Sequence, residues 1–223
     1  MRKIESVLVD NFLELKKELT HSLELLNKSF KKRENNPECI RIYDLLDTDT
    51  SSLKEFDLFK KYISNNVFIS LGGNLGNTLE IFKNSYLEIE KKIGRITAFS
   101  NLYQTAAWGK TDQPDFLNQV ISLETDLHPE KIMSELLAIE LFFGRRRDEI
   151  WGPRILDLDI LFVENQIIST DNLDIPHPQI ANRRFVLIPM AEIAPDFLHP
   201  VLQQTMLELL EQTTDLQSVR VMD

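Results

Sequence analysis

The sequence VFISLGGNLGNTLEIFKNSYLEIEKKIG, residues 67–94, carries the signals of a strand, a tight turn and a helix, in that order. Residues 67–71 are an apolar run that ends at two glycines, which is typical of a buried strand entering a turn. Asn77, followed three residues later by Glu80, predicts a helix start of the capping-box type. Apolar side chains then recur at helical spacing, at Phe82, Tyr86, Ile89 and Ile93. Gly94 closes this predicted helix.

The same design follows a second time. Residues 95–103 and 117–125 read as strands, Pro129 stands at a helix start, and residues 155–163 read as the next strand. The apolar stripe of this second helix has the spacing of the first, at Ile132, Leu136, Ile139 and Phe143. Strand–helix–strand twice over predicts an α+β fold, a ferredoxin-like sandwich with a βαββαβ core and helices on one face of a mostly antiparallel sheet.

The two ends of the chain extend this core. Residues 184–193 predict a further strand, and residues 203–213 predict a last helix. Residues 1–33 predict a helix with an apolar stripe of Ile4, Leu8, Phe12, Leu15, Leu19, Leu23, Leu26 and Phe30. We therefore expect a helical N-terminal extension of unknown role, residues 1–65, before a main domain of residues 66–223. The stripe could pack on that domain or on a second copy, so self-association through residues 1–65 is possible.

Composition excludes several classes of protein. No run reaches the roughly 18 apolar residues of a membrane span, and the N-terminus lacks the apolar core of a signal peptide. Cys39 is the only cysteine, which excludes an internal disulfide and a cysteine-rich zinc site. We expect a cytoplasmic protein. Residues 66–223 hold 13 basic and 23 acidic residues and account for the whole net charge of −10, which disfavours nucleic acid and favours a small anionic ligand.

Two aspartates stand out in the predicted strand 155–163. Side chains alternate along a strand, so Asp157 and Asp159 point to one face, about 7 Å apart. Two unpaired carboxylates on an otherwise apolar strand repel each other, and a divalent cation such as Mg²⁺ removes that conflict. The alternative is an edge strand whose two aspartates face solvent.

Arginines cluster just before this pair. Arg145, Arg146, Arg147 and Arg154 fall within ten residues, and Arg183 and Arg184 follow later. The planar guanidinium suits phosphate oxygens, so the combination indicates phosphoryl chemistry on a polyphosphate. A solvated helix end would explain one or two of residues 145–147 but does not explain Arg154.

Five segments together resemble one family. They are LGGNLGN at 71–77, YQT at 103–105, DQPDFLN at 112–118, WGPRILDLD at 151–159 and IPHP at 175–178. In order and spacing they are similar to 6-hydroxymethyl-7,8-dihydropterin pyrophosphokinase, an enzyme of folate biosynthesis. The resemblance spans residues 66–200. It implies a cytoplasmic transferase that moves pyrophosphate from ATP to the pterin hydroxymethyl group and releases AMP.

The resemblance also implies roles for individual residues. Asp157 and Asp159 would hold two Mg²⁺ ions, and with Arg145 and Arg154 they form the expected catalytic set. The expected ATP-binding residues are Arg145, Arg147, Trp151, Arg154, Ile160, His177 and Arg183. The expected pterin-binding residues are Gly72, Gly73, Asn74, Thr105, Ala106, Trp108, Phe116, Asn118 and Phe185. Small-molecule substrates, and neither nucleic acid nor membrane, are the expected partners.

Alternatives remain open from the sequence. A catalytically inactive, nucleotide-binding regulatory module is the main one, and a two-metal nuclease is another. His177 could be a turn residue, and Phe116 and Phe185 could be ordinary core. Glu140 lies beside the apolar stripe of its helix, where it could support the arginines or simply face solvent.

Overall fold

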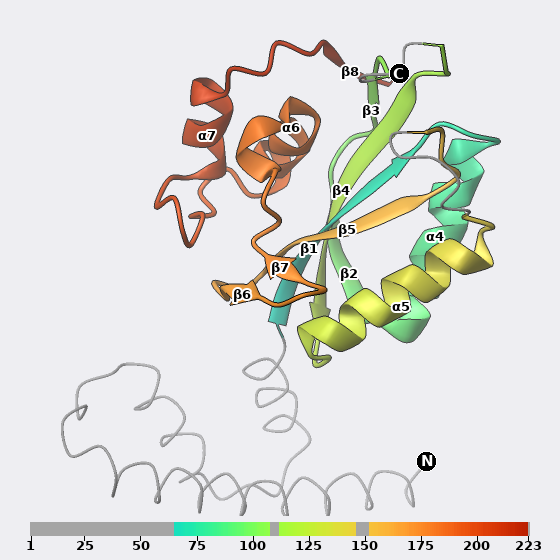
Figure 1. Ribbon diagram of the computed structural model, residues 1–223, viewed down its shortest axis with the longest axis horizontal. Coiled ribbons are helices and arrows are strands. Elements are labelled where there is room, and N and C mark those ends of the chain that lie inside the picture. Colours follow the sequence, from blue (N-terminus) through green and yellow to red (C-terminus); the bar gives the residue numbers. More distant parts are fainter. Residues whose placement is uncertain (1–64, 108–111, 146–151, 223) are drawn as a thin grey trace, which may run out of the picture. The chain divides into compact units, whose positions relative to one another are not determined.

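The computed structural model describes residues 65–107, 112–145 and 152–222 of the chain (Figure 1). The chain divides into two units, Met1–Ile63 and Ser64–Asp223, and the described residues belong to the second. The predicted helical extension lies outside the described residues, except for Asn65, which begins the first strand.

The described unit is built on an antiparallel sheet. Its strands are β1 (Asn65–Gly73), β2 (Arg95–Phe99), β3 (Tyr103–Thr105), β4 (Phe116–Thr125), β5 (Asp157–Val163) and β8 (Val219–Val221). They lie in the order β5-β1-β4-β3-β8, and β2 also pairs with β4. All of these pairings are antiparallel, which confirms the predicted class of α+β fold with an antiparallel sheet. The single strand predicted over 95–103 is two strands, because residues 100–102 leave the sheet.

Helices cover both faces of this sheet. Helices α4 (Thr78–Lys92) and α5 (Pro129–Phe142) pack on one face, where Val67, Ile69 and Leu71 of β1 join their apolar stripes in one core cluster. Phe68, between them, points the other way into a second cluster with α6 (Arg184–Ile193) and α7 (Met206–Gln212). In Figure 1 the two pairs of helices lie on opposite sides of the sheet. The prediction that helices cover one face of the sheet is therefore correct for α4 and α5, but α6 and α7 cover the other face.

Helix α6 corrects the prediction of a strand over residues 184–193. An apolar run of this length fits a buried strand and a buried helix equally well by pattern. The burial of Val186, Leu187 and Met190 follows one helical face, and that face packs on the sheet. The predicted last helix is confirmed as α7, which Thr205 and Glu208 begin with a capping box.

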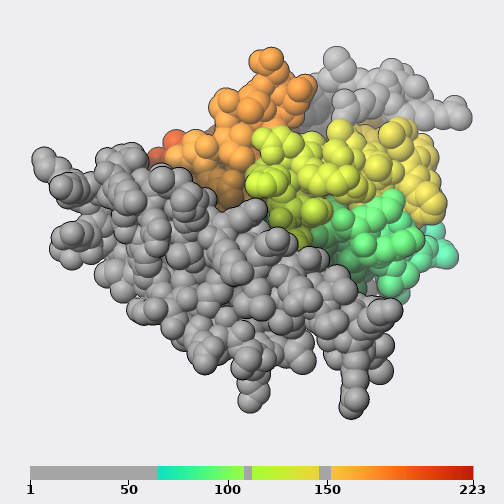
Figure 2. Space-filling view, turned by 90° about the horizontal axis from the view of Figure 1, so that it is seen from below, coloured from blue at the N-terminus to red at the C-terminus, as the bar shows by residue number. Residues whose placement is uncertain are grey.

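Residues 164–183 connect β5 to α6. This segment contains the hairpin β6 (Ile168–Ser169) and β7 (Asp174–Ile175) and the 3-10 turn η1 (Ile180–Asn182). On the face seen in Figure 2 the turn before α5, in yellow-green, lies between this hairpin, in orange, and the α4 region, in green. None of the helices in the described ranges has the length and apolarity that crossing a membrane would require.

Candidate active site

A pocket of about 540 Å³ lies on the face of the sheet that carries α6. This volume is within the range of small-molecule sites. One end is charged and is lined by Arg154, Asp157, Asp159, His177 and Arg183. The other end is lined by the uncharged residues Thr105, Ala106, Phe116, Asn118 and Phe185, with Gly72 between the two ends, and is called the neutral end; the Asp215 carboxylate in the lining is bonded to backbone N–H groups. The fold thus brings most of the predicted site residues together in one cavity.

The strand pairing sets the distance between the two ends. One row of cross-strand partners runs from Asp157 on β5 through Gly72 on β1 and Asn118 on β4 to Tyr103 on β3. Three strand spacings, about 14 Å, separate β5 from β3, whereas Asn118 on β4 is two spacings, about 10 Å, from Asp157.

The two aspartates share one face of β5, as the alternation predicts. Asp157 and Asp159 line the pocket, whereas Leu158 and Ile160 are buried in the core beneath α4 and α5. Ile160 is an expected ATP-binding residue, and its side chain lies on the far side of the strand from the pocket. Any contact between Ile160 and a ligand would therefore come from its main chain.

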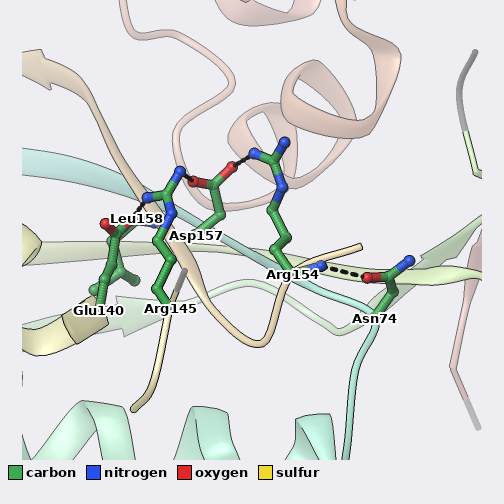
Figure 3. Close-up of polar contacts among 6 residues, drawn as sticks. All are labelled: Asn74, Glu140, Arg145, Arg154, Asp157 and Leu158. Atoms are coloured by element: carbon green, nitrogen blue, oxygen red, sulfur yellow. Dashed lines mark hydrogen bonds and ion pairs between the residues drawn. The ribbon is translucent and has the colours of Figure 1, made fainter. Parts of the chain in front are cut away.

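Asp157 is paired with two arginines (Figure 3). Nη2 of Arg145 lies 2.6 Å from one oxygen of the Asp157 carboxylate, and Nη1 of Arg154 donates to the other oxygen. The three side chains are only 17% to 27% exposed, so solvent weakens these pairs less than surface ion pairs. Arg145 does not line the cavity itself; it contacts the pocket through Asp157.

Glu140 of α5 holds Arg145 from the other side. Its side chain is 1% exposed, forms an ion pair with Nη1 of Arg145, and accepts a hydrogen bond of 2.7 Å from the backbone N–H of Leu158. Burial raises the pKa of Glu140 to about 7, against the opposing effect of the Leu158 and Arg145 hydrogen bonds. Of the two alternatives for Glu140, the structure shows the one in which it supports the arginines.

Asp159 has a different environment. Burial, and then the negative charge of Asp157, raise the pKa of Asp159 to about 6. No described residue donates a hydrogen bond to its carboxylate, although Arg183 is close enough to act on its charge. A partly enclosed carboxylate with free oxygens, next to a second carboxylate on the same strand face, fits a divalent cation. The described residues include no group of three or more such ligands, so other ligands would have to come from substrate or water.

The glycine turn after β1 fixes the backbone of Arg154. Asn74 accepts a hydrogen bond of 2.8 Å from the Arg154 N–H, and its own N–H donates to the Arg154 carbonyl at 2.9 Å. A Cβ on Gly73 would lie 2.7 Å from the Ile155 carbonyl oxygen, so only glycine allows this approach. Gly73 and Asn74, expected to contact the pterin, do not line the cavity, and that expectation stays a prediction.

The neutral end offers rings and amides. Nδ2 of Asn118 donates to Oγ1 of Thr105 at 2.9 Å, which leaves the Asn118 carbonyl oxygen for a ligand. Phe116 comes from the start of β4 and Phe185 from the start of α6, and both are partly exposed in the cavity. Such a combination suits a flat heteroaromatic ring with polar edges.

His177 stands near the charged end. The backbone N–H of His177 donates a hydrogen bond of 3.0 Å to the Leu161 carbonyl oxygen, which connects His177 to β5. Burial, and then the positive charge of Arg183, lower the pKa of His177. Its Nδ1 accepts a hydrogen bond of 3.2 Å from the Gln179 N–H, so Nε2 is the nitrogen left for a ligand.

Other lining residues were missed from the sequence. They are Ser70, Leu161, Gln179, Asn182, Val186, Thr214, Asp215 and Gln217. Ser70 and Leu161 could have been found, because strand alternation places them on the faces of Gly72 and Asp159. Thr214, Asp215 and Gln217 of the C-terminal tail lie outside any predicted strand or helix, so no periodic pattern indicated that they line the pocket. Trp108, Arg147 and Trp151 lie outside the described residues.

The fold and the pocket together define a class of enzyme. Carboxylates paired with arginines suit the metal-bound phosphates of a nucleotide, and the aromatic, amide-bearing end suits a planar second substrate. The model of the 7,8-dihydro-6-hydroxymethylpterin-pyrophosphokinase (HPPK) family matches residues 68–195, and the chain belongs to that family.

Curated relatives agree with this assignment. The 2-amino-4-hydroxy-6-hydroxymethyldihydropteridine pyrophosphokinase of Synechocystis is 41% identical over 145 residues, which are 65% of this chain and 74% of the relative. The enzyme of that name from Haemophilus influenzae is 38% identical over 155 residues, covering 69% of this chain and 96% of the relative. The Plasmodium falciparum HPPK-DHPS A437G crystal structure with STZ-DHP aligns with a TM-score of 0.56 at 18% identity, over 67% of this chain and 45% of that chain, and shows the fold alone.

Replacing Glu140 with alanine tests the buried link between α5 and β5. We expect the Glu140→Ala variant to lose about 3 kcal/mol of unfolding free energy, because Arg145 loses a buried partner and the Leu158 N–H loses its acceptor. Urea denaturation measures this loss. Lys131→Ala breaks the exposed Lys131–Glu135 pair on the same helix and should leave the midpoint nearly unchanged. Equal midpoints for both variants would contradict the structural role of Glu140.

Proposed function

We infer that this chain transfers the pyrophosphoryl group of ATP to 6-hydroxymethyl-7,8-dihydropterin, which yields AMP and the pterin diphosphate in folate biosynthesis. The observation that carries this inference is the single pocket with two chemically different ends. The charged end suits a triphosphate, and the neutral end suits the pterin. Membership in the family and the shape of the site therefore support the same reaction.

The reaction requires alignment more than covalent help from the protein. The hydroxymethyl oxygen attacks the β-phosphorus, the bond between that phosphorus and the oxygen bridging to the α-phosphate breaks, and AMP leaves with that oxygen. The hydroxyl proton passes to solvent or to a phosphate oxygen. The attacked phosphorus must lie between the two ends of the pocket. We therefore place the triphosphate beside Asp157, on the side that faces Gly72.

Asp157 and Asp159 are the residues that would hold Mg²⁺, with two ions as the proposed number. When bound, the metal neutralises charge on the phosphate oxygens during transfer. Asp159 has free oxygens for this purpose, whereas Asp157 is shared with Arg145 and Arg154. We therefore propose that an arginine which leaves Asp157 turns to a phosphate oxygen, so that neither charge is left unpaired.

The pterin would lie between Phe116 and Phe185. Ring stacking from two sides supplies affinity, and directed hydrogen bonds select the ring edge. Asn118 is the proposed partner of that edge, held in orientation by Thr105. His177 and Arg183 are proposed to bind the nucleotide, because both line the charged end.

An AMP-release assay tests the function directly. We expect the full chain, incubated with ATP and Mg²⁺, to release AMP only when 6-hydroxymethyl-7,8-dihydropterin is added, because transfer requires its hydroxyl group. Chromatography of the nucleotides measures the product. Nucleotide binding without AMP release in the presence of the pterin would instead support a regulatory module.

The carboxylate of Asp159 should be indispensable for turnover. Because losing a group that only supports a metal ligand already costs 10- to 100-fold, we expect Asp159→Asn to lower kcat/KM by at least about 100-fold. Stability should not fall, because the like-charge conflict with Asp157 disappears. Asp196→Asn, an exposed position outside the pocket, is the matched control. Turnover of Asp159→Asn at the control's rate would overturn the metal assignment.

Self-association through residues 1–65 is a separate proposal, supported by the apolar stripe in that part of the sequence. We expect deletion of residues 1–60 to lower the solution mass by more than the deleted mass, because a dimer would become a monomer. Light scattering after size-exclusion chromatography measures both masses. A change equal to the deleted mass would contradict the proposal.

A further inference from the structure

The C-terminal tail forms one wall of the pocket. After α7 the chain returns to the sheet, and Thr214, Asp215 and Gln217 line the cavity before β8 pairs with β3. This tail lies beyond residues 68–195, where the family model matches. Its position on the sheet identifies the end of the pocket that it closes. Strand β8 is the neighbour of β3 and lies farthest from β5, so the tail stands at the neutral end.

Besides the pairing of β8 with β3, two side-chain contacts join the tail to other elements, one to the start of α6 and one to the segment after β3. The Asp215 carboxylate accepts a hydrogen bond of 2.8 Å from the backbone N–H of Arg184, the first residue of α6. It accepts a second one, of 2.9 Å, from the backbone N–H of Gln217. Both of its oxygens are thereby used, and a carboxylate at a helix N-terminus is stabilised by the helix dipole. Nε2 of Gln217 donates to the Ala106 carbonyl at 2.7 Å, next to Thr105. Asp215 therefore positions the tail.

Gln217 has a polar atom left over. Its amide nitrogen is held by Ala106, which orients the side chain, and no described residue donates to its Oε1. The side chain is partly buried in the lining of the cavity. An oriented amide oxygen in a pocket accepts from a ligand N–H. The 2-amino-4-oxo ring of a pterin presents such N–H groups along its edge, whereas a triphosphate presents only acceptors.

We propose that Gln217 is a pterin-binding and specificity-determining residue, which accepts a hydrogen bond from the ring edge through Oε1. The proposal rests on the proposed function, because it names the pterin as the ligand of this end. Asp157 on β5 lies three strand spacings, about 14 Å, from β3 and the Ala106 that Gln217 contacts, so this side chain does not reach the phosphates bound there.

The test compares the affinities of two ligands in the full-length wild type and three full-length variants. Gln217→Met keeps the length of the side chain and removes both polar atoms, and Ser218→Ala changes the next, exposed residue as a control. Fluorescence titration measures the Kd of 6-hydroxymethylpterin and of a non-hydrolysable ATP analogue. We expect Gln217→Met to raise the pterin Kd about 10-fold, as for one lost hydrogen bond, and to leave the nucleotide Kd within about twofold.

A purely structural role would give a different pattern. If Gln217 only ties down the tail through Ala106, Gln217→Met lowers the melting temperature of the free protein, and Gln217→Glu raises the pterin Kd as much as Gln217→Met does; that pattern would overturn the proposal. An unchanged pterin Kd would also overturn it. Gln217→Glu, which keeps an acceptor oxygen but no donor for Ala106, should give a pterin Kd between those of wild type and Gln217→Met. AMP release by the wild type separates failure of this inference from failure of the proposed function. If the wild type releases AMP and Gln217→Met leaves the pterin Kd unchanged, only the inference about Gln217 is wrong. If the wild type does not bind the pterin, the proposed function and the inference are both wrong.

Discussion

Two carboxylates on one face of β5 determine which charged groups the rest of this site must provide. Asp157 and Asp159 are held side by side by the alternation of a strand whose other face is core, so they cannot turn apart without disrupting that core. Their charges must be compensated where they stand. Arg145 and Arg154 neutralise Asp157, and Asp159 remains without a donor among the described residues. Asp159 is therefore the carboxylate of this pair whose oxygens stay open to a cation.

The groups that compensate Asp157 are fixed from opposite directions. Arg145 follows α5 and is held by Glu140, whose other contact is the backbone of β5 itself. Arg154 precedes β5, and its backbone is held by Asn74 in the turn after β1. The end of a helix and the turn after a neighbouring strand thus converge on one carboxylate. Gly72 completes the arrangement, because its missing side chain leaves open the path from Asp157 to Asn118.

Much of this could be read from the sequence, for identifiable physical reasons. Period-two and period-3.6 patterns gave the sheet and the helices α4 and α5, and the same alternation put Asp157 and Asp159 on one face. The prediction for residues 184–193 was wrong, because a short apolar stretch fits a strand or a helix and Pro189 is disfavoured inside both. Packing on Phe68 and Val120 favours the helix. The contribution of Gln217 was out of reach, since only the tertiary path of the tail brings it to Ala106.

The charges near β5 show how the pocket can exchange ligands without a large electrostatic cost. Among the described residues, Asp157, Asp159 and Glu140 face Arg145, Arg154 and Arg183, so three acidic and three basic side chains balance in the free protein. A triphosphate brings about four negative charges, and two Mg²⁺ ions would bring the same number of positive charges. The balance would be kept after binding, and only the partners would change. An arginine that left Asp157 would have a phosphate oxygen as its next partner, so we expect bound nucleotide and bound metal to favour each other.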